Sequence, residues 1–114
     1  MKVWCICPQS GGSKIPPNLQ KIITKQANAY AAKQAWSRTF QIKLRYKNQF
    51  CYLDASEKGK DDFPIGRLRY FSNGKWSLAF YAYSNETYKP CVFQNGGWFG
   101  TLEEAIDICS VYLI

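Results

Sequence analysis

The strongest constraint on the fold is that the hydrophobic residues change their spacing twice along the chain. Over residues 15–30 they recur every three or four positions, as on one face of a helix. From Phe40 to Tyr83 apolar residues largely alternate with polar ones, which is typical of half-buried strands. Helical spacing returns from Leu102. This order predicts an α+β fold: an antiparallel sheet of about five strands with an N-terminal and a C-terminal helix packed on it.

Two helices are predicted, at residues 17–35 and 101–113. Pro17 suits the first turn of a helix, because proline lacks an amide hydrogen that would have no partner there. Thr101 and Glu104 have the spacing of a capping box. The residues expected on the buried sides are Ile15, Leu19, Ile22, Ile23, Ala27 and Tyr30 in the first helix and Leu102, Ala105, Ile106, Cys109, Tyr112 and Leu113 in the second.

Five strands are predicted between the helices. Asn73 and Gly74 form the dipeptide typical of a tight hairpin, and Pro90 marks the last strand as an edge. Residues 56–62 are the most polar stretch and are predicted as a surface loop. The expected strands are residues 40–46, 50–53, 65–71, 76–83 and 88–94.

The size of the chain, 114 residues, predicts one domain with one core. We expect an irregular lead-in at residues 1–14 and a single domain at 15–114. The opening apolar run is too short for a signal peptide, and no stretch has the length of a membrane span. Five cysteines, an odd number, are read as free thiols of a cytoplasmic protein.

The chain contains no histidine, which excludes a Ser-His-Asp or Cys-His enzyme. Most acidic residues lie in a polar loop or in the first turns of a helix, where a structural role explains them. We therefore expect no catalytic residue, no cofactor and no small-molecule substrate, so that the protein is not an enzyme.

The amino-terminal segment from Cys5 to Gly12 resembles a zinc-ribbon knuckle, which supplies two of the four ligands that zinc needs. Ser10 replaces the second knuckle cysteine, and no further pair of closely spaced cysteines follows. We expect no metal, although a site that joins Cys5 and Cys7 to distant cysteines stays open. Cys51, Cys91 and Cys109 lie in apolar patterns and are expected as small buried hydrophobes.

Charge is distributed unevenly. Residues 1–53 hold nine basic residues and no acidic one, whereas residues 54–114 hold six basic and eight acidic residues. A basic half of this kind attracts nucleic acid, an acidic protein or an anionic surface, or serves solubility alone.

Three predicted strands each place two cations or rings on one face. If these faces coincide, one side of the sheet presents cations that can bind phosphates and flat rings on which bases can stack. The alternative is an ordinary hydrated sheet face with tyrosines packed under arginine stems. The residues concerned are Lys43 with Arg45, Arg67 with Arg69, and Tyr81 with Tyr83.

The motifs Gly66-Arg67-Leu68-Arg69, Gly74-Lys75-Trp76 and Gly97–Ala105 resemble the three-strand-plus-helix DNA-binding domain of ethylene-response factors and integrase arm-binding domains. The resemblance covers about the last 50 residues. It implies that the sheet side chains at Arg67, Arg69, Lys75 and Trp76 meet DNA while the helix packs behind. The chain as a whole resembles an uncharacterised small bacterial family of cyanobacterial character.

The sequence thus favours a non-enzymatic domain that binds nucleic acid through a basic, aromatic sheet face. The alternative is a protein-interaction or oligomerisation module, which would use the apolar C-terminal helix to bind another protein or a second copy. No membrane partner is inferred. The expected nucleic-acid-binding residues are Lys43, Arg45, Arg67, Arg69, Lys75, Trp76, Tyr81 and Tyr83.

Overall fold

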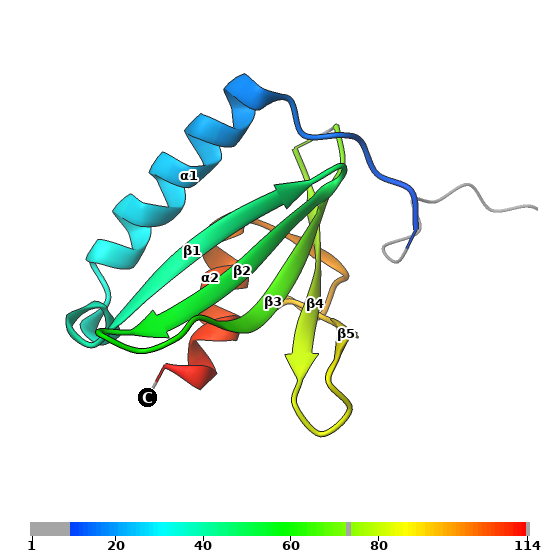
Figure 1. The fold of residues 1–114 in the computed structure, drawn as a ribbon. Coiled ribbons are helices and arrows are strands. Elements are labelled where there is room, and N and C mark those ends of the chain that lie inside the picture. Colours follow the sequence, from blue (N-terminus) through cyan, green and yellow to red (C-terminus); the bar gives the residue numbers. More distant parts are fainter. Residues whose placement is uncertain (1–9, 73, 114) are drawn as a thin grey trace, which may run out of the picture.

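The structure is a computed structural model that describes residues 10–72 and 74–113. Its centre is one antiparallel sheet in which five strands follow one another in chain order (Figure 1). A short sixth strand pairs with the fourth. The strands are β1 (Phe40–Lys47), β2 (Phe50–Glu57), β3 (Phe63–Tyr70), β4 (Trp76–Ala82), β5 (Thr87–Cys91) and β6 (Phe99–Gly100).

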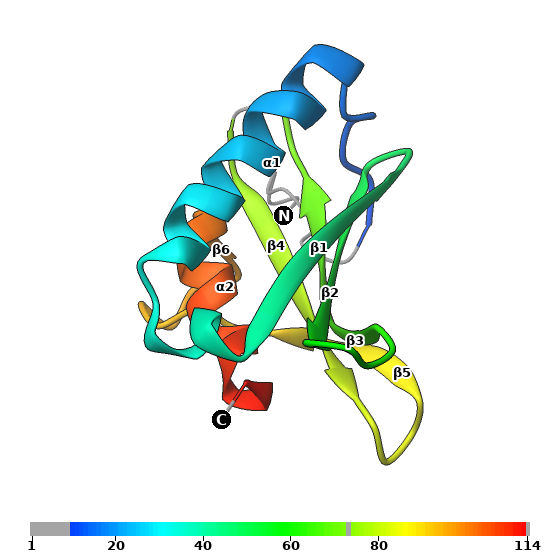
Figure 2. The ribbon, with the colours of Figure 1, turned by 60° about the vertical axis from the view of Figure 1, so that its left-hand side comes forward.

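Two α-helices, α1 (Pro17–Ala32) and α2 (Leu102–Cys109), lie side by side on one face of this sheet (Figure 2). Short 3-10 helices follow them, η1 at Ala35–Arg38 and η2 at Ser110–Tyr112. No helix of the described residues covers the opposite face of the sheet, which we call the outer face. The expected α+β fold with an antiparallel sheet and two helices is therefore confirmed.

Several predicted element bounds were wrong. α1 ends at Ala32 rather than at residue 35, because Gln34 is extended, with ψ at 145°, before η1 begins. Regular α2 ends at Cys109, and η2 completes the predicted helix. β2 runs on to Glu57, into the predicted loop, because Phe40 and Gln41 of β1 pair with Glu57 and Ser56.

The core lies between the helices and the sheet. α1 contributes Ile23, Ala27 and Ala31, which are spaced four residues apart. The expectation that Ile22 is buried was wrong, because its side chain lies about 100° around the helix from Ile23 and is 59% exposed. The sheet contributes aliphatic residues such as Leu53, which is fully buried.

Local chemistry fixes α2 against the sheet. The predicted capping box is present: the Thr101 amide donates to Glu104 Oε1 at 2.9 Å, and the Glu104 amide donates to Thr101 Oγ1 at 3.2 Å. On β3, Gly66 lies beneath the helix, and a Cβ at this position would be 2.5 Å from Cys109 Sγ. The missing side chain therefore allows the helix to approach the strand closely.

Residues 10–16, which contain no helix or strand, cross the ends of two strand connections. The Ser13 amide donates to the Tyr70 carbonyl at 2.9 Å, and the Ile15 amide donates to the Asn48 carbonyl at 3.0 Å. Ile15 is completely buried. Cys5 and Cys7 of the predicted knuckle lie outside the described residues, and no metal-binding cluster exists among the residues that are described.

Candidate nucleic-acid interface

Strand register assembles the outer face in rows of cross-strand neighbours. One row pairs Arg45 with Tyr52, Tyr52 with Arg67, and Arg67 with Ala79. The adjacent row runs through Lys47, Phe50, Arg69 and Ser77 in the same way. Tyr81 and Tyr88 are paired at the β4–β5 side of this face. The register thus brings the predicted cations of β1 and β3 onto the same face as Tyr81.

Arginine side chains lie over rings on this face. The Arg67 guanidinium carbon is 4.5 Å from the Phe50 ring centre and 5.1 Å from that of Tyr88. Arg69 also lies over Phe50, at 4.6 Å, and Arg45 lies over Tyr52, at 4.8 Å. Such contacts are attractive, because the electron-rich face of a ring interacts favourably with a cation.

The rings also form a continuous chain toward the end of β4. Tyr52 and Tyr88 have centres 5.7 Å apart, Tyr88 and Tyr81 are 5.0 Å apart, and Tyr81 and Tyr83 are 4.7 Å apart. All three pairs meet edge to face, so ring surfaces remain tilted against one another. The Tyr83 hydroxyl donates to the Pro64 carbonyl at 2.6 Å. This bond holds the half-exposed Tyr83 ring at the end of the row of tyrosine rings.

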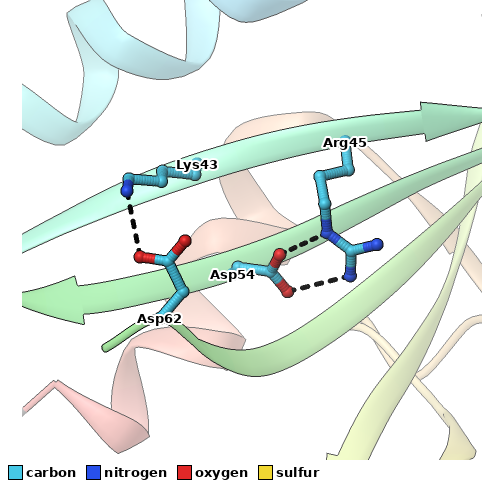
Figure 3. A network of polar contacts seen from close by, with 4 residues as sticks. All are labelled: Lys43, Arg45, Asp54 and Asp62. Carbon is cyan, nitrogen blue, oxygen red and sulfur yellow. Dashed lines mark hydrogen bonds and ion pairs between the residues drawn. The ribbon is translucent and has the colours of Figure 1, made fainter.

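Two of the predicted cations are ion-paired (Figure 3). Arg45 binds Asp54 in a bidentate manner, with Nε bonded to Oδ2 and Nη2 to Oδ1 at 3.2 Å. The hydrogen bonds that Arg45 donates to Asp54 raise the pKa of Arg45 above its ordinary value. Lys43 Nζ lies 2.9 Å from Asp62 Oδ1. Two of the three cations that β1 places on the outer face are therefore compensated, and the third is Lys47.

Arg67 differs from these two residues. It forms no ion pair with any described residue, and its guanidinium lies between two rings at the middle of the face. Its neighbour Arg69 donates from Nη1 to the Gly11 carbonyl at 2.8 Å, which links it to the segment before α1. Arg67 is thus the cation best placed to meet a negatively charged ligand.

Two predicted site residues lie elsewhere. Trp76 is 6% exposed and points to the helix side, where its ring contacts that of Tyr70 at 5.2 Å. Trp76 therefore cannot meet a ligand on the outer face, contrary to expectation. Lys75 precedes β4, and its ammonium lies 5.8 Å from the Phe99 ring at the β6 end of the sheet.

Phe50, Tyr52 and Tyr88 belong to the outer face but were not among the predicted site residues. Phe50 and Tyr52 alternate with the buried residues Cys51 and Leu53, so the period of two could have identified them. Their aromatic character concealed this signal, because the segment reads as an uninterrupted apolar run. Tyr88 could be assigned only from its pairing with Tyr81.

The C-terminal helix offers a weaker surface for a partner. Leu102, Ala105, Ile106 and Cys109 are all buried in the core, so most of its apolar side is already covered. Val111 beyond it is exposed and lines an open groove of about 640 Å³ with Trp36 and Phe40.

No protein-family model matches the chain, and no match was found among curated proteins or solved structures. Among the described residues, no helix combines the length and apolar character needed to span a bilayer.

Proposed function

We propose that the outer face of the sheet binds single-stranded nucleic acid and that the domain is a binding module rather than an enzyme. The observation that carries this proposal is the placement of Arg67 between Phe50 and Tyr88 without an acidic partner among the described residues. A guanidinium in this position offers charge to a phosphate, and the surrounding rings offer surfaces on which bases stack.

A single strand fits this surface better than a duplex does. Bases in a duplex are stacked on one another, so their flat faces are not available to side chains, whereas unpaired bases can spread over an open sheet. Reading of a duplex in the manner that the resemblance implies would use Trp76, and this residue is buried on the opposite side. The aromatic lining at Phe50, Tyr52 and Tyr88 supports the single-strand alternative.

The test is titration of a fluorescent oligothymidylate with the purified protein at low salt, followed by fluorescence anisotropy. Replacing Arg67 by glutamine should weaken binding at least about tenfold and lower the logarithmic salt slope by about 0.7, because one phosphate contact is lost. The matched control is Lys33→Gln, which removes one charge from an exposed residue after α1 and should leave both quantities unchanged.

Thermal unfolding of both variants confirms that binding is compared between folded proteins. The proposal is wrong if the unmodified protein has no measurable affinity for the oligonucleotide, or if Arg67→Gln and Lys33→Gln bind equally well. Tighter binding of a duplex of mixed sequence would refute the preference for single strands.

A further inference from the structure

Among the described residues, the sheet has a long edge at β1 with no further strand beside it. This strand pairs with β2 along all eight residues and with no other described strand. In an antiparallel pair every second residue directs its amide and carbonyl away from the partner strand. Outside the β1–β2 ladder, no hydrogen bond among the described residues involves the backbone of residues 40–47. These outward groups are a template for another extended chain.

A groove accompanies this edge on the helix side. Figure 1 shows α1 running alongside β1, and two adjoining hollows of about 660 and 360 Å³ lie between them. The larger is bounded by one side of α1 and by Tyr46, and the smaller by the end of α1 and by Phe40 and Ile42. Asn28 borders both hollows, so they adjoin one another, and at the larger one the Tyr46 hydroxyl is hydrogen-bonded to Thr24 and Gln20 of α1.

The charged residues that line the two hollows are both lysines. Lys21 and Lys25, one helical turn apart on α1, line the larger hollow, and no acidic residue lines either hollow. Neither lysine forms an ion pair with a described residue. Residues 10–53 contain no acidic residue at all. A second copy of β1 would bring like charges together, whereas an acidic chain would be attracted.

We propose that the β1 edge and the groove beside α1 bind an extended acidic peptide segment of another protein by strand addition. The peptide backbone pairs with the outward amides and carbonyls of β1, which supplies affinity independent of sequence. Alternate side chains enter the groove, where their carboxylates reach Lys21 and Lys25, and the residues between them point to the other side of the strand. This site is separate from the outer face, so it does not depend on nucleic-acid binding there.

The probe is a fluorescein-labelled peptide with the length of β1, eight residues, that alternates glutamate and valine. We expect it to bind the unmodified protein at low salt. Double replacement Lys21→Glu with Lys25→Glu should weaken binding by about tenfold or more, because two favourable charges become repulsive. The matched control, Lys58→Glu with Lys89→Glu, makes the same change at exposed residues outside the groove and should alter affinity less than about twofold.

Two further measurements separate strand addition from simple charge attraction. A peptide of the same sequence that is N-methylated at every residue has no amide hydrogen to donate to β1 and should lose most of its affinity. Hydrogen exchange should slow at the β1 amides that point away from β2 and remain unchanged in β5. Equal binding of the methylated peptide, or equal weakening by both double replacements, would overturn the proposal.

An oligothymidylate titration of the same variants covers the competing ligand class. If Lys21→Glu with Lys25→Glu abolishes oligonucleotide binding and leaves peptide binding intact, the groove is a nucleic-acid site and the proposal is wrong. Retained oligonucleotide binding together with lost peptide binding supports two independent sites.

Discussion

The two faces of the sheet are built from the same strands but have different chemistry. On β3, Leu68 is completely buried against the helices, while its neighbours Arg67 and Arg69 lie over rings on the outer face. The helix side consists of interlocked apolar groups that exclude water. The outer side consists of half-exposed cations and rings, and part of each side chain remains accessible to a ligand. Adjacent residues therefore serve stability and binding separately, and substitutions one position apart should have different consequences.

The largest effect should appear in the reactivity of the three described cysteines, which all lie on the helix side of the sheet but at different depths. Burial raises the pKa of Cys51 and of Cys109 from 9.0 to about 12, so the folded protein holds both as neutral thiols at about pH 8. Their thiolate fraction falls about a thousandfold relative to unfolded chains. Iodoacetamide labelling followed by mass spectrometry should modify Cys91, which is half-buried, well before them. Equal rates for the three thiols would contradict the buried core on the helix side.

The second contrast concerns stability. Leu68→Ala removes a fully buried side chain and should lower the free energy of unfolding by about 2–5 kcal/mol. Arg67→Ala, one residue away, removes only partly exposed cation–ring contacts and should cost about 1 kcal/mol. Urea unfolding monitored by tryptophan fluorescence measures both values. A larger loss for Arg67→Ala would make the outer face part of the scaffold.

Binding should show the reverse order. Tyr88→Ala removes the ring that contacts Arg67, Tyr52 and Tyr81, and affinity for an oligothymidylate should fall by about 1–3 kcal/mol. Tyr88→Phe keeps the ring and should bind like the unmodified protein. Fluorescence anisotropy at a temperature where both variants are folded makes the comparison. A loss in both variants would assign the effect to the hydroxyl and not to stacking.

The smallest effect is expected at the ion pair between Arg45 and Asp54. Asp54→Asn removes the carboxylate that compensates Arg45, which is itself largely exposed. If the outer face binds a single strand, one more cation becomes available, and the logarithmic salt slope should rise by about 0.7. Asp62→Asn tests the same idea at Lys43. An unchanged slope in both variants would place the β1 side of the face outside the path of the strand.

Features set by residues close together in the sequence could be predicted from it, whereas features set by contacts between distant residues could not. Periodicity is local, and it sufficed for the fold class and for the shared face of Arg67 and Arg69. The pairing of Arg45 with Asp54 joins different strands and depends on register, so neither residue alone indicates that the charge is compensated.

The tryptophan shows a different limit. Trp76 alternates in phase with the apolar residues Leu78 and Phe80, so the period of two predicts that its side chain is buried. The resemblance instead implied that Trp76 contacts DNA. The exposure of Ile22 illustrates a further limit, because the direction from which the sheet approaches a helix is set by tertiary packing.

Gly66 beneath Cys109 has a consequence for how this chain can diverge. A methyl group at position 66 would overlap the sulfur, so position 66 cannot gain a side chain unless position 109 becomes smaller. Among descendants of this sequence, alanine or serine at 66 should therefore accompany glycine or alanine at 109, and the two positions should covary. Such linked substitutions would identify distant relatives that share the strand–helix contact after their surface residues have diverged.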